Sequence, residues 1–158
     1  MNNNFTEMNR TIKLIICLLA LGIPYKSFSQ ATDIKPQANH QALCVKDLDA
    51  SVKFYSEVIL LERMNSPFNN ASIQWLKTGP KTELHLIKGD CSGATHFRNV
   101  HMSFAVPSLD GYMKHLDKYN IKYDSAAGEK KPQIRGDGVH QIYFQDPDGY
   151  WIEINDAK

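Results

Sequence analysis

The feature that most constrains the fold of this chain is a duplication inside it. An offset of 61 residues, the distance from His40 to His101, also relates several other pairs of similar residues. These pairs are Leu43 and Phe104, Val45 and Val106, Leu48 and Leu109, Asp49 and Asp110, and Val52 and Met113. Matched positions at one offset indicate a repeated strand–helix unit, and two copies predict a paired domain rather than a solenoid.

The first copy has the pattern of a strand, a helix and further strands. Alternation of apolar residues predicts a strand from Asn39 to Val45, and a helix follows with Asp47 or Asp49 as its cap. Two more strands are expected, over 72–77 and 82–87. In the second of these, the glutamate and the histidine lie on the face opposite the leucines.

The second copy repeats this order and ends in a hairpin. A strand is expected from His101 to Val106, then a helix that begins at Leu109. The copy is longer than the first, and we place the extra residues in a loop over 126–138. The segment 140–154 contains two alternating strands around an Asp-Pro-Asp-Gly turn. Its last strand carries Glu153 on the face opposite its isoleucines.

One histidine and one glutamate therefore recur in each copy, away from the apolar face. They are His40 and Glu83 in the first copy, and His101 and Glu153 in the second. Two nitrogen and two oxygen donors facing one cavity suit one divalent ion, Zn, Ni, Co, Mn or Fe. Two further positions of an octahedron would remain for waters or for two adjacent oxygens of a substrate. The alternative is four unrelated residues on the solvated sheet faces.

These residues lie in motifs that resemble a known family. The motifs are His40, the segment from Val45 to Asp49, Phe54-Tyr55, Glu83-Leu84, His101, and the segment from Asp146 to Glu153. Together they resemble the vicinal oxygen chelate superfamily, with the greatest likeness to glyoxalase I, also called lactoylglutathione lyase. The resemblance implies an α+β fold of two βαβββ modules around a metal, and a homodimer. It also implies the ligand set His40, Glu83, His101 and Glu153.

The resemblance implies an activity as well. Glyoxalase I isomerises the hemithioacetal of methylglyoxal and glutathione, and a metal-bound glutamate moves the proton, a role that falls to Glu153 or Glu83. We therefore expect a metal-dependent lyase or isomerase for a small oxygen-rich substrate chelated through adjacent oxygens. No basic set for glutathione is found beyond Arg135. A metal-free binding or resistance protein and an extradiol-type dioxygenase are the alternatives within the family.

Three further residues are candidates for substrate binding. Arg135 can hold an anionic group, and Tyr143 and Trp151 can line the cavity or simply fill it. His85 lies two residues from Glu83 on the same face, where it can support that glutamate, replace it as a ligand, or form the cavity wall.

The length and charge of the chain limit the other possibilities. A chain of 158 residues is long enough for one domain with a hydrophobic core, which we place at 39–156, with module one at 39–89 and module two at 99–156. The net charge of +1 and the absence of a long basic run argue against a nucleic-acid partner. A small molecule is the expected partner.

The first residues have the pattern of an export signal. Arg10 and Lys13 precede the apolar run 14–23, and small residues follow before Gln30, which predicts a signal peptide over 1–29 and a polar leader over 30–38. The run is too short for a stable membrane span. We therefore expect a periplasmic or extracellular protein. Of the cysteines that remain, Cys44 and Cys91 are expected to be free, because the sequence does not bring them together.

Overall fold

The structure, a computed structural model, describes residues 34–158. The expected signal peptide lies outside the described residues, as does the start of the expected leader. Residues 37–158 form one compact unit. Within residues 34–158, no helix has the length and apolar character needed to cross a membrane.

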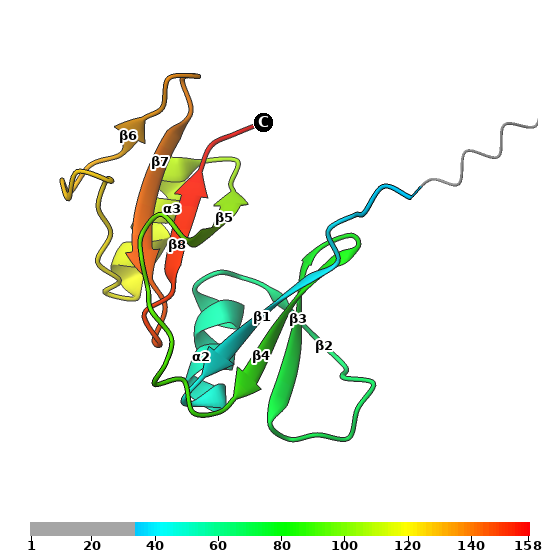
Figure 1. Ribbon diagram of the computed structural model, residues 1–158. Coiled ribbons are helices and arrows are strands. Elements are labelled where there is room, and N and C mark those ends of the chain that lie inside the picture. The colour runs from blue at the N-terminus through cyan, green and yellow to red at the C-terminus, as the bar shows by residue number, and fades with distance from the viewer. Residues whose placement is uncertain (1–33) are drawn as a thin grey trace, which may run out of the picture. The chain divides into compact units, whose positions relative to one another are not determined.

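Module one contains a mixed sheet and one helix (Figure 1). The elements are β1 (His40–Val45), α2 (Leu48–Glu57), β2 (Glu62–Met64), β3 (Ile73–Gly79) and β4 (Thr82–Lys88). The strand order is β1-β4-β3-β2, with β1 parallel to β4 and the other neighbours antiparallel. The Asp47 side chain accepts a hydrogen bond from the backbone N–H of Ala50, so this aspartate caps α2.

Module two has the same order of elements. They are β5 (His101–Ala105), α3 (Leu109–Lys118), β6 (Gln133–Ile134), β7 (His140–Gln145) and β8 (Trp151–Asn155). The strand order β5-β8-β7-β6 repeats that of module one, again with the first and last strands parallel. The predicted α+β fold of paired βαβββ modules is therefore confirmed. The short strands β2 and β6 were not predicted from the sequence; each lies at the edge of its sheet.

Each sheet buries one face and leaves the other free for polar side chains. Leu84 and Leu86 of β4 and Ile152 and Ile154 of β8 are fully buried. They belong to one hydrophobic core that also includes Leu116 of α3. Successive residues of a strand point to opposite faces, so the histidines and glutamates of interest lie on the open faces.

The Asp-Pro-Asp-Gly turn joins module two to module one. Asp146 is buried, and its Oδ2 accepts a 2.8 Å hydrogen bond from the hydroxyl of buried Tyr55 in α2. Asp148 accepts hydrogen bonds from the backbone N–H of Lys46 and from the hydroxyl of Ser51. At Gly149, φ is +96°, and a Cβ there would lie 3.2 Å from the ring of His96. The turn that begins β8 is therefore fixed against the other module.

The expectation that both cysteines are free is wrong. Cys44 and Cys91 form a disulfide, with their Cα atoms 5.7 Å apart. The parallel pairing of β1 with β4 places Cys44 opposite Ile87, so the chain that leaves β4 passes beside Cys44. This proximity depends on a strand pairing between distant segments, which the spacing of cysteines does not reveal.

Candidate metal and substrate site

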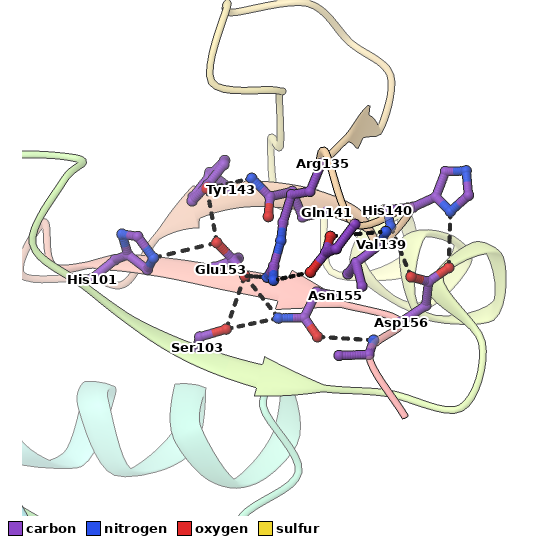
Figure 2. A network of polar contacts seen from close by, with 12 residues as sticks. His101, Ser103, Arg135, Val139, His140, Gln141, Tyr143, Glu153, Asn155 and Asp156 are labelled. Atoms are coloured by element: carbon purple, nitrogen blue, oxygen red, sulfur yellow. Dashed lines mark hydrogen bonds and ion pairs between the residues drawn. The ribbon is translucent and has the colours of Figure 1, made fainter.

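Glu153 lies at the centre of a polar network on the open face of module two (Figure 2). It pairs with Ser103 on one neighbouring strand and with Tyr143 on the other. The Ser103 hydroxyl and the Asn155 amide donate to Oε1 at 3.0 and 2.7 Å, and the Tyr143 hydroxyl donates to Oε2 at 2.8 Å. Gln141 donates to the Tyr143 oxygen at 2.7 Å. These hydrogen bonds hold the carboxylate in place, and Glu153 is only 5% exposed.

These contacts set the charge of the network. Burial acts to raise the pKa of Glu153, but the hydrogen bonds from Asn155, Tyr143 and Ser103, together with nearby His101, outweigh it and leave the pKa below its ordinary value. Burial and the hydrogen bond to Glu153 raise the pKa of Tyr143 to about 12. At neutral pH, Glu153 is therefore an anion and Tyr143 a neutral donor.

His101 is oriented by a backbone carbonyl. Its Nδ1 lies 2.7 Å from the carbonyl oxygen of Arg98, which can only accept, so Nδ1 carries a proton. Its Nε2 lies 3.3 Å from Oε2 of Glu153. In the neutral ring, the lone pair of Nε2 faces the carboxylate, and only a proton or a cation between the two atoms makes that contact favourable.

His40 has a similar arrangement in module one. Its Nδ1 lies 2.6 Å from the side-chain oxygen of Asn39, which leaves the lone pair of the neutral ring on Nε2. Glu83 is the direct neighbour of His40 in the pairing of β1 with β4. The carboxylate of Glu83 accepts a 2.9 Å hydrogen bond from Nε2 of His85.

The strand registers show that Glu83 and Glu153 are not structurally equivalent. Glu83 lies opposite His40, whereas Glu153 lies opposite Ser103, two residues beyond His101. The residue that occupies the position of Glu153 in module one is His85, which lies opposite Ala42. The recurrence of one glutamate per copy is real in sequence, but the two carboxylates occupy neighbouring rows of their sheets.

One cavity brings the two modules' candidates together. His40, Glu83, His101 and Ser103 are among the residues that line a cavity of about 470 Å³, and Glu153 adjoins it through its contact with His101. In the described part of the chain, no three histidine, cysteine, aspartate or glutamate side chains are gathered closely enough to hold a metal ion. The types of donor and the orientations of the two histidine rings fit a divalent cation. In the structure, however, Glu83 contacts His85 and Glu153 contacts His101.

The expected substrate-binding residues lie around Glu153. Nη1 of Arg135 is 3.9 Å from Oε1 of Glu153, and Nη2 pairs with Asp137 at 2.6 Å. Trp151 is covered by the guanidinium of Arg98, which lies 4.2 Å from the ring centroid. Tyr143 contacts the glutamate directly. The structure therefore places all three residues in one neighbourhood on the open face of module two.

Sequence reasoning missed several members of this neighbourhood. Ser103 and Asn155 share strand faces with His101 and Glu153, so the alternation of the strands was a signal that could have identified them. Arg98 lies in the segment that joins the modules, where no pattern marks it. It donates to the carbonyl of Ser125 at 2.6 Å and pairs with Asp124.

Comparisons with known proteins agree with this architecture. Residues 37–154 match the family model described as "Glyoxalase/Bleomycin resistance protein/Dioxygenase superfamily". The chain is 30% identical over 123 residues to "Glyoxylase I 4" of Arabidopsis thaliana, an alignment that covers 73% of this chain and 68% of the relative. It is 26% identical over 124 residues to "Lactoylglutathione lyase" of Salmonella typhimurium, covering 75% and 91%.

A solved structure shows the same fold. The genomically encoded fosfomycin resistance protein FosX from Listeria monocytogenes superposes with a TM-score of 0.62 at 20% identity. The superposition covers 79% of this chain and 96% of that protein. At this identity the likeness concerns the fold and not the reaction.

Proposed function

We propose a metal-dependent lyase or isomerase activity of the glyoxalase I type for this chain. The chain belongs to the glyoxalase/bleomycin resistance protein/dioxygenase superfamily. The substrate is a small molecule that presents two adjacent oxygens. The observation that carries the proposal is the orientation of the two histidines. Nδ1 of His40 and of His101 each faces an amide or carbonyl oxygen, which leaves Nε2 of each neutral ring as a metal donor.

The residues that would hold the metal are His40, Glu83, His101 and Glu153. When bound, a divalent ion supplies Lewis-acid chemistry, stabilising negative charge on substrate oxygens. The protein's own part is to hold the donors and to keep Glu153 anionic, for which the hydrogen bonds from Ser103, Asn155 and Tyr143 are suited.

The two glutamates are suited to different roles. Protonation of Glu153 would weaken the three hydrogen bonds that its carboxylate accepts from Ser103, Asn155 and Tyr143. Glu83 accepts a hydrogen bond from His85 alone among the described residues. We therefore assign the proton transfer between adjacent substrate carbons to Glu83, and a permanently charged role to Glu153.

Two features bear on where and how the protein works. A disulfide between Cys44 and Cys91 is compatible with an oxidising compartment, which supports export to the periplasm or the extracellular space. A homodimer is expected from the family resemblance, and sedimentation of the purified protein tests it. We propose Arg135, Tyr143 and Trp151 for contacts to the polar part of a substrate, because Tyr143 donates to Glu153 and Nη1 of Arg135 lies 3.9 Å from its Oε1.

The activity is tested with the hemithioacetal of methylglyoxal and glutathione, and with small α-hydroxy ketones, in deuterated water. The proposal predicts metal-dependent incorporation of deuterium at the carbon next to the carbonyl, and its loss in Glu83→Gln. Incorporation that persists at the uncatalysed rate with every divalent ion and substrate would contradict the proposal. Oxygen consumption with Fe(II) would indicate the dioxygenase chemistry instead.

One observation favours a second function, the binding of a small molecule without turnover. Both carboxylates already have protein partners, Glu83 through His85 and Glu153 through its own network, and the described residues gather no three metal ligands. A metal-free binding or resistance protein would use the same cavity as a container. Ligand affinity measured with a chelator present separates the two functions, because only the container keeps its affinity.

A further inference from the structure

His85 occupies a distinctive place on the open face of module one. It lies on β4 between Ala42 of β1 and Trp75 of β3. Its ring stacks on the indole of Trp75 with a centroid separation of 4.0 Å, and on the ring of His40 with one of 4.4 Å. The side chain is only 12% exposed. The two stacks fix the plane of the imidazole, and the contact of Nε2 with Glu83 fixes which edge of the ring faces that carboxylate.

The fixed ring presents a donor to Glu83. Nε2 of His85 lies 2.9 Å from Oε2 of Glu83, and because a carboxylate only accepts, this nitrogen carries the proton. A protonated nitrogen has no lone pair for a metal ion. While the bond persists, Nε2 of His85 therefore orients the carboxylate and does not itself coordinate a cation.

The comparison of the two modules shows why this donor matters. In module two, Ser103 lies opposite Glu153 and donates to it, with Asn155 and Tyr143 as further donors. In module one, the residues opposite Glu83 are His40 of β1 and Lys77 of β3. Among the described residues, only His85 donates a hydrogen bond to the Glu83 carboxylate, so a single imidazole has the part that several donors have in module two.

We propose that His85 is a positioning residue that holds the Glu83 carboxylate and the adjacent His40 ring in the orientation that binds a metal ion. This inference rests on the metal site proposed above and assigns a role to a residue outside the ligand set. Removing a partner that orients a metal ligand lowers metal affinity by about 10- to 100-fold in other metal sites. The same loss is expected when the His85 donor is removed.

Substitutions separate the two contacts of the ring. His85→Phe keeps a flat ring between His40 and Trp75 but removes the hydrogen bond to Glu83. His85→Gln keeps an N–H donor and removes the ring. The matched control is His140→Phe, which breaks another histidine–carboxylate pair. Nδ1 of His140 lies 3.1 Å from Oδ2 of Asp156, and neither residue lines the cavity that contains His40 and His101.

The probe is Co²⁺, whose visible absorption reports coordination geometry and whose affinity is measured by competition with a chelator. The purified protein and each variant are first checked for folding by circular dichroism. We expect His85→Phe to weaken Co²⁺ binding by about 10- to 100-fold and to change the spectrum. His85→Gln should restore most of the affinity, and His140→Phe should match the wild type.

Three results would overturn the inference. Unchanged affinity and spectrum in His85→Phe would show that the donor is not needed, while the proposed metal site would stand. Loss as complete as in His40→Ala, with no recovery in His85→Gln, would make His85 a direct ligand. A wild-type protein that binds no Co²⁺ would remove the proposed site together with the inference. Should His85→Phe not fold, His85→Ala gives the same comparison with no larger group on the open face.

Discussion

Replacing both Cys44 and Cys91 by alanine should destabilise the protein substantially. The disulfide closes a loop across a sequence separation of 47 residues. In the chain-entropy treatment, a cross-link of this span lowers the conformational entropy of the unfolded state and so raises the free energy of unfolding by about 4 kcal/mol. Engineered bridges often deliver less, so we expect the free energy of unfolding to fall by about 2–4 kcal/mol, from a total that is typically about 5–15 kcal/mol.

Urea unfolding followed by tryptophan fluorescence measures this loss. The oxidised protein, the reduced protein and the double variant are compared, and peptide mapping without reductant establishes that Cys44 and Cys91 are linked. The reduced protein and the double variant should unfold at similar, lower urea concentrations than the oxidised protein. Identical midpoints for all three, with the linked peptide present, would refute the reasoning from loop closure.

Three other perturbations test the packing and the site. Tyr55→Phe removes the charge-assisted hydrogen bond to the buried carboxylate of Asp146, and we expect the free energy of unfolding measured in urea to fall by about 2 kcal/mol. An unchanged midpoint would mean that this bond does not stabilise the contact between the turn and α2. Gly149→Ala places a side chain at a positive φ of +96° and should lower the thermal midpoint, whereas Gly136→Ala, where φ is not positive, should not. The raised pKa of Tyr143, about 12 against an ordinary 10.0, means that the folded state keeps the proton longer than the unfolded state. Its contribution to stability is therefore complete below about pH 10 and is lost as pH rises towards 12. Tyrosinate absorbance, with Tyr143→Phe as the reference, should show an earlier titration in Glu153→Gln; an unaltered titration would exclude the carboxylate as a cause.

Much of the fold could be predicted because its pattern is local. The apolar alternation in β4 and β8 indicated which faces are buried, and of the two candidate caps, Asp47 and Asp49, the structure selects Asp47 for α2. The strands β2 and β6 escaped prediction because they are short edge strands, with three and two residues, whose pairing depends on a neighbouring strand.

The site was less accessible because it depends on register. Alternation places Glu83 and His85 on one face but does not show which of them lies opposite His40, since that requires the offset between β1 and β4. One glutamate in the last strand of each copy made Glu83 the counterpart of Glu153 in the sequence, but the strand pairing assigns that place to His85. The disulfide and the position of Arg98 over Trp151 likewise arise from contacts between distant segments.

The metal content of the purified protein, prepared without affinity metals and compared with Glu83→Ala and Glu153→Ala, tests the central proposal most directly. Elemental analysis should find close to one divalent ion per chain in the wild type and clearly less in both variants. The identity of the ion then ranks the lyase against the dioxygenase, and loss only in Glu153→Ala would indicate a three-ligand site. A wild-type protein that stays empty after reconstitution with several divalent ions would contradict the metal site and leave the binding protein as the function.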